Sequence, residues 1–233
     1  DYTEAHYSLG NVLLQRGKLE AAAESYQQAL KLKPDYAEAH YNLGNVLLQQ
    51  NKLQAAVKAY QQALKLKPDY VEAHYSLGNV LLQQGKIEAA IEAYQQVVKI
   101  QPDLTEAYNN LGNALKQQGK LEAAVEAYEQ ALNIQTDEAL FYNLGTALSE
   151  QSKLEAAVEA YQQALKTQPD YALAKLGICM SQLPIIYSRV DEIQLKRNQY
   201  QQHLQNLAHH YQVAQPKERA EAAEAIGSLQ PFY

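Results

Sequence analysis

The chain has 233 residues, of which 20% are charged, and its formal net charge at pH 7 is −6. This mild acidity argues against a nucleic-acid partner, because proteins that bind nucleic acid carry clustered lysine and arginine. The single cysteine, Cys179, excludes an internal disulfide and fits a reducing, cytoplasmic compartment. No apolar run of about 18 residues is present to span a membrane, and no signal peptide is recognisable. The chain does not begin with methionine, so we expect it to be a piece of a longer protein.

Near-identical segments organise most of the sequence. Residues 35–68 read DYAEAHYNLGNVLLQQNKLQAAVKAYQQALKLKP, and versions of this segment occur once before it and three times after it. Three spacings between aligned glycines are 34 residues and one is 33. A fixed period of this size predicts stacked repeats, each of which buries its apolar face against its neighbours. The aligned small and aromatic positions are Gly10, Gly44, Gly78, Gly112 and Gly145; Ala22, Ala56, Ala90, Ala124 and Ala157; and Tyr26, Tyr60, Tyr94, Tyr128 and Tyr161.

The period, the Leu-Gly pair, the alanine, the tyrosine and the closing proline resemble the tetratricopeptide-repeat (TPR) family over residues 1 to about 183. This resemblance implies an all-α fold: a right-handed superhelical TPR solenoid of helix-turn-helix repeats with a C-terminal capping helical tail. The fourth repeat has Thr136 in place of proline and is one residue shorter, so we expect a change of stacking there. We expect five repeats at 1–34, 35–68, 69–102, 103–136 and 137–169, a partial sixth at 170–183 and a helical cap or connector at 184–233.

Each repeat carries start and stop signals for two helices. The first helix is expected to begin at an aspartate N-cap with a glutamate three residues later, which together form a capping box. It should end at a glycine, asparagine or serine, and four of the five ending residues are types that tolerate a left-handed conformation. The second helix, Leu19 to Leu32 in the first repeat, should stop before a proline. The capping pairs are Asp1/Glu4, Asp35/Glu38, Asp69/Glu72 and Asp103/Glu106, the helix-ending residues are Gly17, Asn51, Gly85, Gly119 and Ser152, and the prolines are Pro34, Pro68, Pro102 and Pro169.

Polar and aromatic residues form three rows beside the Leu-Gly pair, away from the apolar core positions. In the TPR family, the first helices of successive repeats line a concave groove that holds an extended peptide. Amides can pair with a peptide backbone because they both donate and accept hydrogen bonds, and tyrosines add apolar area with a polar tip. Alternatively, these residues are only the polar face of the helices, or some asparagines bond between repeats. The candidate groove residues are Tyr7, Asn11, Tyr41, Asn42, Asn45, Tyr75, Asn79, Asn109, Asn110, Asn113, Tyr142 and Asn143, with Ser8, Ser76 and Thr146 in the same rows.

The charges near these rows favour an extended partner that is neutral to basic. The TPR subgroup that clamps the carboxylate of chaperone C-termini needs lysine or arginine at the groove. Here Lys116 is the one cation close to the rows, whereas four glutamates lie nearby, although helix capping also accounts for them. These glutamates are Glu4, Glu38, Glu72 and Glu106.

No pattern in the sequence indicates catalysis or a bound cofactor. It has no phosphate-binding glycine loop, nucleophile elbow or metalloprotease histidine pair. His6, His40 and His74 recur once per repeat, but no carboxylate or thiol completes a metal set, so we expect partly buried packing. His203, His209 and His210 in the tail give an equally weak signal for a metal.

The tail departs from the repeats. Cys179 stands where the repeats have glycine, and Pro184 should end the helix that begins the sixth repeat. A long helix capped by Ser188 and a last helix over residues 216–226 are expected to cover the end of the array. The segment CMSQLPIIYSRVDEIQLKRNQYQQHLQNLAHHYQ and the final LQPFY are similar to the connector after the repeats in O-linked N-acetylglucosamine transferase-like (SPINDLY-like) bacterial proteins.

Three interpretations of function follow. The leading one is a protein–protein interaction scaffold that binds an extended peptide segment in the concave groove lined by asparagine and tyrosine. The second, implied by the resemblance of the tail, is the substrate-recognition arm of a glycosyltransferase whose catalytic half is absent from this chain. The third is a self-assembling structural array, in which the repeat ends or the tail pair with another copy.

Overall fold

The computed structural model describes residues 2–181, 198–206 and 208–209, and all regular secondary structure in these residues is helical. This agrees with the all-α class expected from the sequence. Residues 198–206 form a helix within the tail. The repeat helices are α1 (Tyr2–Gln15), α2 (Leu19–Leu32), α3 (Ala37–Gln49), α4 (Leu53–Leu66), α5 (Val71–Gln83), α6 (Ile87–Ile100), α7 (Thr105–Gln117), α8 (Leu121–Ile134), α9 (Glu138–Glu150), α10 (Leu154–Thr167) and α11 (Ala172–Ser181).

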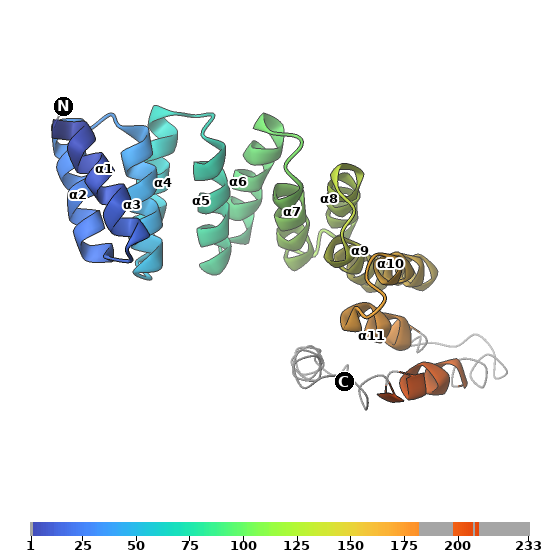
Figure 1. The fold of residues 1–233 in the computed structure, drawn as a ribbon. Coiled ribbons are helices and arrows are strands. Elements are labelled where there is room, and N and C mark those ends of the chain that lie inside the picture. The colour runs from blue at the N-terminus through green and yellow to red at the C-terminus, as the bar shows by residue number, and fades with distance from the viewer. Residues whose placement is uncertain (1, 182–197, 207, 210–233) are drawn as a thin grey trace. The chain divides into compact units, whose positions relative to one another are not determined.

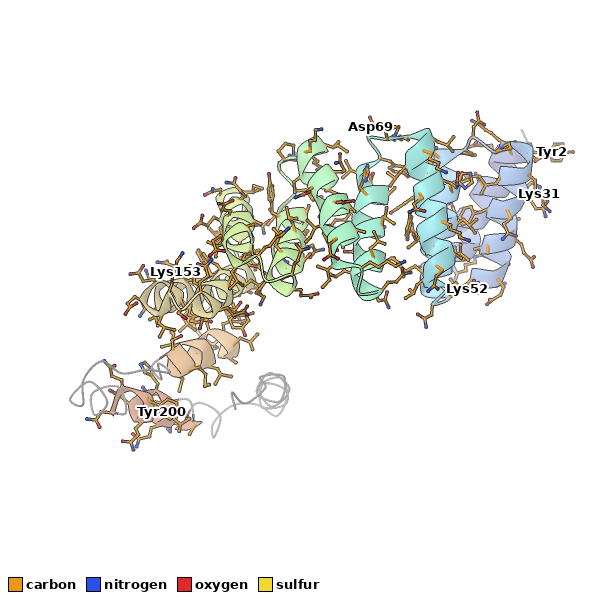
Figure 2. All side chains as sticks on the ribbon, turned by 180° about the vertical axis from the view of Figure 1, so that it is seen from behind. Tyr2, Lys31, Lys52, Asp69, Lys153 and Tyr200 are labelled. Atoms are coloured by element: carbon orange, nitrogen blue, oxygen red, sulfur yellow. The ribbon has the colours of Figure 1, made fainter. Side chains whose placement is uncertain are left out.

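The chain divides into two compact units, residues 1–120 and 121–233, and the repeat helices stack within each. In the first unit, α1 packs against α2, α3 against α4 and α5 against α6, and each second helix also packs against the first helix of the next pair (Figure 1). Lys52, between α3 and α4, and Asp69, between α4 and α5, lie at opposite ends of these helices (Figure 2). In the second unit, α9 packs against α8 and α10, and α11 packs against both α9 and α10. Among the described residues, no helix combines the length and the apolar character needed to cross a membrane.

The conserved spacing of glycine and tyrosine within each repeat has a steric reason. Tyr60 of α4 is fully buried, and its ring lies directly against the backbone of Gly44 in α3. A Cβ atom on Gly44 would lie 2.6 Å from Tyr60 Cε1, closer than atoms in contact can approach. The same close approach joins Gly10 to Tyr26. The glycine therefore sets how closely the two helices of a repeat can pack.

Successive repeats share a continuous core of small and branched side chains. Val46 of α3 is fully buried in a cluster with Ala22 and Tyr26 of α2. At the equivalent positions of α1, Val12 is 43% exposed and Leu9 is 50% exposed. The same residue types are thus covered where a repeat stacks in front of them and exposed on the first helix, as the nearest-neighbour packing of repeat arrays requires.

The expected helix ends are confirmed. All five residues assigned to the end of a first helix have positive φ, from 58° to 79°. In the first repeat, the Gly17 N–H donates to the Leu14 carbonyl and the Lys18 N–H to the Leu13 carbonyl, both at 2.9 Å. This pair of bonds is the Schellman arrangement, which satisfies carbonyl groups at a helix terminus. Ser152 adopts φ 61° in the same arrangement, although it carries a side chain that usually disfavours this conformation.

The capping boxes expected at Asp35/Glu38, Asp69/Glu72 and Asp103/Glu106 are wrong. Helix α3 begins at Ala37, so its N-cap is Tyr36, in extended backbone and without a side-chain capping bond. Asp35 lies one residue too early to reach the first free N–H groups. The N-caps of α5 and α7 are likewise Tyr70 and Leu104, without side-chain capping bonds. Asp1, of the first predicted pair, lies outside the described residues.

The shortened repeat lacks the residue that should follow Asp137, and this places the aspartate in a true capping position. The N-cap of α9 is Asp137, and its Oδ1 accepts hydrogen bonds from the backbone N–H groups of Ala139 at 2.8 Å and Leu140 at 3.1 Å. In the other repeats, a tyrosine or leucine separates the aspartate from the helix. Deleting that one residue brings the aspartate next to Glu138, the first residue of α9, so the shortened repeat gains a cap.

Most of the expected cap lies outside the described residues. Helix α11 occupies the partial sixth repeat, and Cys179 within it is buried. Pro184, Ser188 and the expected helix at residues 216–226 fall in segments that the structure does not describe.

We predict that Gly44→Ala destabilises the fold. The added methyl group would press on the buried Tyr60 ring, and overpacking of this kind costs about 1–3 kcal/mol. Alanine's higher helix propensity offsets about 1 kcal/mol of that cost, so a net loss of up to about 2 kcal/mol is expected in chemical denaturation. The matched control is Gly85→Asn, where φ is +71°, nothing lies within 4 Å of an added Cβ, and Asn51 occupies the equivalent position. Equal stability of the two variants would contradict the steric role of Gly44.

Candidate functional site

The candidate groove residues fall on the first helices of the repeats. We call the set on the first unit the amide face. Tyr142 and Asn143 lie on α9 in the second unit, where both are partly buried. None of the candidate residues is fully buried, so their side chains are not sealed between layers. The amide face comprises Tyr7 and Asn11 on α1, Tyr41, Asn42 and Asn45 on α3, Tyr75, Ser76 and Asn79 on α5, and Asn109, Asn110 and Asn113 on α7.

Each buried core tyrosine of the first three repeats donates its hydroxyl hydrogen bond to an asparagine of the amide face. The ring fills the core, and the buried hydroxyl bonds to an asparagine of the preceding helix. Because a buried hydroxyl without a partner would be costly, the asparagine is a structural requirement of the tyrosine. The donor-to-acceptor distances are 2.7 Å from Tyr26 Oη to Asn11 Oδ1, 2.8 Å from Tyr60 Oη to Asn45 Oδ1 and 2.6 Å from Tyr94 Oη to Asn79 Oδ1.

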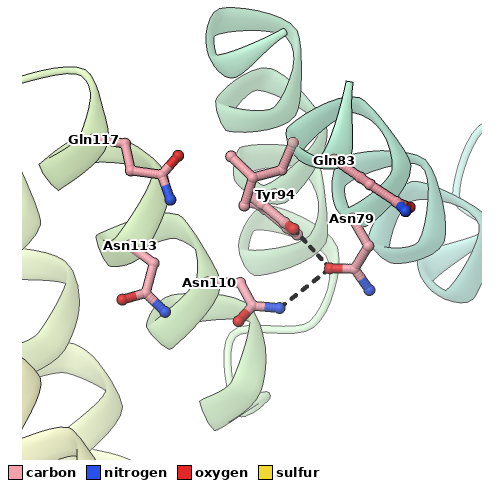
Figure 3. Close-up of a pocket in the computed structure, with 7 residues that line it drawn as sticks. Asn79, Gln83, Tyr94, Asn110, Asn113 and Gln117 are labelled. Atoms are coloured by element: carbon pink, nitrogen blue, oxygen red, sulfur yellow. Dashed lines mark hydrogen bonds between the residues drawn. The ribbon is translucent and has the colours of Figure 1, made fainter. Parts of the chain in front are cut away.

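A second row of asparagines joins neighbouring repeats. Asn42 Nδ2 of α3 donates to Tyr7 Oη and to Asn11 Oδ1 of α1, both at 3.0 Å. Two repeats later, Asn110 Nδ2 of α7 donates to Tyr75 Oη at 3.0 Å and to Asn79 Oδ1 at 3.3 Å, and Figure 3 shows the second of these bonds. The alternative considered from the sequence, asparagines that bond between repeats, therefore holds for Asn42 and Asn110.

These internal bonds use half of each amide and leave the other half available. Within the part of the chain that the structure describes, the Nδ2 groups of Asn11, Asn45 and Asn79 donate to no protein atom, and the Oδ1 groups of Asn42 and Asn110 accept from none. The bonds that are formed hold each amide in one orientation. The amide face thus presents fixed donors in one row and fixed acceptors in the next.

A third set of tyrosines, missed in the sequence analysis, packs on the tyrosines of the amide face. The ring of Tyr36 lies 4.8 Å from that of Tyr7, and the ring of Tyr70 lies 5.0 Å from that of Tyr41. In the second unit, Tyr171 lies 6.0 Å from Tyr142. The signal in the sequence was the Asp-Tyr dipeptide that opens the repeats. The aspartate of this dipeptide does not cap a helix in the second and third repeats, and the tyrosine supplies the ring.

Two of these rings each have a lysine side chain lying over them. Lys33 Nζ is 4.9 Å from the ring centroid of Tyr36, and Lys67 Nζ is 4.5 Å from that of Tyr70. At these distances the ammonium group is attracted to the negative face of the ring. Both pairs belong to the sequence Lys-Pro-Asp-Tyr, at residues 33–36 and 67–70.

The glutamates that were expected to cap helices include one that contacts a tyrosine of the next repeat and two that act electrostatically on another. Tyr36 Oη donates to the Glu4 carboxylate at 3.2 Å and 3.3 Å. Burial and this hydrogen bond to Glu4 raise the pKa of Tyr36 to about 12. The pKa of Tyr70 is also raised, first by burial and then by the negative charge of Glu72. Capping therefore does not account for the negative charge along this part of the molecule.

Two pockets open on the first unit. One, of about 350 Å³, lies between α5 and α7 and is lined by Asn79, Gln83, Tyr94, Asn110, Asn113 and Gln117 (Figure 3). The other, of about 410 Å³, is lined by both Tyr41 and Tyr75 of the amide face and by two glutamates. Six members of the amide face therefore line one of these two concave sites.

The histidines of the second and third repeats tie helix to loop. His40 Nε2 lies 2.9 Å from the Pro34 carbonyl oxygen, and His74 Nε2 lies 2.9 Å from that of Pro68. Because a carbonyl can only accept, Nε2 carries the proton in each bond. Among the described residues, no group of three or more His, Cys, Asp or Glu side chains could hold a metal ion.

The amide rows do not continue through the second unit. Thr146, at the asparagine position of α9, donates its Oγ1 hydrogen bond to the Asn143 carbonyl at 2.8 Å. On α11, Gly177 stands at the position of Asn42, and its backbone packs against the Tyr161 ring. Cys179 is buried there, and burial raises the pKa of its thiol.

Models of the TPR repeat match residues 10–51, 44–85 and 78–119, and those of the tetratricopeptide repeat match 105–136 and 139–171. These matches span most of the chain, and it therefore belongs to the tetratricopeptide-repeat family. They stop at residue 171, so they give no support to the resemblance of the tail to a glycosyltransferase connector. A comparison with curated proteins finds no match.

Solved structures with the same fold include other TPR proteins. YrrB, described as a TPR protein with an unusual peptide-binding site, is 28% identical with a TM-score of 0.67, over 72% of this chain and 88% of that one. MamA from Desulfovibrio magneticus is 24% identical, with a TM-score of 0.68, over 73% of this chain and 97% of that one. PilF from Pseudomonas aeruginosa is 20% identical with a TM-score of 0.65, over 98% of both chains.

We predict that Tyr60→Phe lowers stability because it removes the hydrogen bond to Asn45 while keeping the ring. The expected loss is about 0.5–1.5 kcal/mol in chemical denaturation, the usual contribution of such a bond. Tyr2→Phe is the matched control, since Tyr2 is 82% exposed. Loss of its hydroxyl should change stability by less than about 0.5 kcal/mol. If both variants unfold at the same denaturant concentration, the Tyr60–Asn45 bond does not support the repeat.

Alkaline pH should unfold the protein through its tyrosines. Burial raises the pKa of Tyr26 to about 12 and that of Tyr171 to about 12, from the usual value of 10.0 for tyrosine. A raised pKa means that the folded state favours the neutral phenol. Its contribution to stability is complete below pH 10 and is lost as the pH rises toward about 12. The near-ultraviolet absorbance of phenolate should therefore rise at a higher pH in the folded chain than in the chain unfolded by guanidinium, where tyrosine has a pKa of about 10. Coincident titration curves would contradict this prediction.

Proposed function

We propose that the chain is a protein–protein interaction scaffold that binds an extended peptide segment along the amide face. The observation that carries the proposal is the alternation of fixed donors and acceptors. Asn45 and Asn79 each keep a free N–H group, and Asn42 and Asn110 each keep a free carbonyl oxygen. A peptide backbone in extended form presents the complementary groups at regular intervals, so it can pair with these amides whatever its side chains are.

Pre-organisation supports binding at this face. Each free amide group belongs to a side chain whose other end is already hydrogen-bonded to the protein, so binding would freeze little additional motion. Ordering a flexible side chain costs about 0.5–1.5 kcal/mol, and a side chain held in advance avoids that cost. The half-buried tyrosines Tyr41 and Tyr75 add rigid apolar surface beside the amides.

The charge around the amide face favours a partner that is neutral to basic. Glu4 accepts a hydrogen bond from Tyr36, whose ring packs on Tyr7 of this face. Glu38 and Glu72 act on Tyr70, whose ring packs on Tyr41. An acidic tail would meet these carboxylates, so we do not expect a clamp for a C-terminal carboxylate. YrrB, described as having an unusual peptide-binding site, supports peptide binding on this fold. Nothing in the described residues indicates catalysis, and the scaffold function requires none.

Selection of linear peptides from a random displayed library, followed by titration of the synthesised peptides, tests the proposal. We expect Asn45→Ala together with Asn79→Ala to weaken binding at least about 10-fold, since two lost hydrogen bonds of about 1 kcal/mol each exceed the 1.4 kcal/mol of a tenfold change. Peptides of unrelated sequence should be affected alike because the contacts are to the backbone.

The matched control removes two amides from the outer helices of the same repeats. Gln61→Ala together with Gln95→Ala changes exposed residues of α4 and α6 and should leave affinity unchanged. Thermal melts of each variant check that the fold persists. The proposal fails if no peptide is selected, or if a folded Asn45→Ala/Asn79→Ala variant binds the selected peptides as tightly as the unaltered chain.

A further inference from the structure

The pocket of about 410 Å³ has a composition that differs from the rest of the amide face. Tyr41, Tyr75 and Leu104 supply apolar walls, and Glu72 and Glu106 bring two exposed carboxylates to the same cavity. No lysine or arginine lines it. The pocket lies within the first unit, where α3, α5 and the connection between α6 and α7 meet.

The preceding joint shows what occupies this place elsewhere in the same chain. There Lys67 lies over the ring of Tyr70, and that ring packs against Tyr41. One period later, the equivalent residues are Gln101 and Leu104, because Lys-Pro-Asp-Tyr has become Gln-Pro-Asp-Leu. Both replacements line the pocket. The cavity therefore stands where the preceding joint holds a cation against an aromatic ring.

The acidic surroundings of that cation are retained at the pocket. At the preceding joint, the negative charges of Glu72 and Glu38 act on Tyr70. At the pocket, Glu72 is joined by Glu106, one period after it, while the lysine is lost. The carboxylates thus remain and the chain's own counter-charge does not.

We propose that this pocket receives a basic side chain, arginine in preference to lysine, from the peptide bound along the amide face. The proposal rests on the proposed function. It adds a site that selects one side chain to a surface that otherwise binds only the backbone of the peptide. The aliphatic stem would pack on Leu104, and the charged head would lie near Glu72 and Glu106. There it would form charge-assisted hydrogen bonds, which are stronger than bonds between neutral groups. A planar guanidinium also stacks on a tyrosine ring, which an ammonium group cannot do.

Methyl-detected NMR with a small probe tests the pocket without requiring a known partner. The probe is N-acetyl-arginine methylamide, and N-acetyl-citrulline methylamide is its neutral isostere. We expect saturable shifts of the Leu104 and Val71 methyl signals with the arginine probe and at least about 10-fold weaker binding of the citrulline probe, as removal of a charge-assisted pair predicts. Equal binding of the two probes, or shifts confined to other methyl groups, would overturn the proposal.

Two variants separate the pocket from its surroundings. Gln101→Lys with Leu104→Tyr restores the residues of the preceding joint, which the fold already accommodates, and should abolish binding of the arginine probe by filling the site. Glu72→Gln with Glu106→Gln should weaken binding at least about 10-fold. Glu20→Gln with Glu24→Gln, on the exposed face of α2, is the matched control and should leave it unchanged. An unaltered affinity in either pocket variant counts against the site.

Selected peptides distinguish this inference from the proposed function. If peptides bind in a manner sensitive to Asn45→Ala/Asn79→Ala but tolerate citrulline at every arginine, the scaffold function stands and the pocket assignment fails. If no peptide is selected, the scaffold function fails, and the arginine probe still decides whether the pocket accepts a basic side chain.

Discussion

The hydrogen bond from a buried tyrosine hydroxyl to an asparagine of the preceding helix holds the rest of this structure in place. Tyr60 fills the core only because Gly44 lets its ring approach the backbone, and its hydroxyl donates a hydrogen bond to Asn45 beside that glycine. The Leu-Gly-Asn sequence therefore serves packing and polar satisfaction at once. The same asparagine then shows its remaining N–H group on the surface, so the surface that we assign to peptide binding is a by-product of how the core is built.

Much of the fold followed from the sequence because repetition amplified weak local signals. Five helix ends were recognised from a glycine, asparagine or serine at the same place in each repeat, and all five have positive φ. The starts were misjudged, since Asp35 lies one residue before Tyr36 and the spacing to Glu38 imitates a capping box. A pattern of residue types cannot show such a displacement when two adjacent residues are both plausible caps.

The positions of the asparagines and tyrosines on the site could be predicted from the sequence, whereas their hydrogen bonds could not. Asparagine and tyrosine at fixed positions indicated a polar face, but only the structure shows that Asn42 is bonded to Asn11 and that half of each amide is already used. The role of Tyr36 was hidden because the Asp-Tyr dipeptide resembled a helix start. The pocket beside Leu104 cannot be predicted from the sequence. It forms because leucine replaces the tyrosine that packs on Tyr41 at the preceding joint, and only the structure shows that packing.

The bond from Asn42 to Asn11 spans two repeats, and an equivalent bond links Asn110 to Asn79. Ser76 takes the intervening position and hydrogen-bonds to Tyr60, so the asparagine-to-asparagine bond is found at every second joint of the first unit. The asparagine-to-asparagine bonds on this surface therefore recur every two repeats. Evolution could lengthen such a protein by duplicating a pair of repeats and so extend its reach along a ligand chain, without redesigning any single contact.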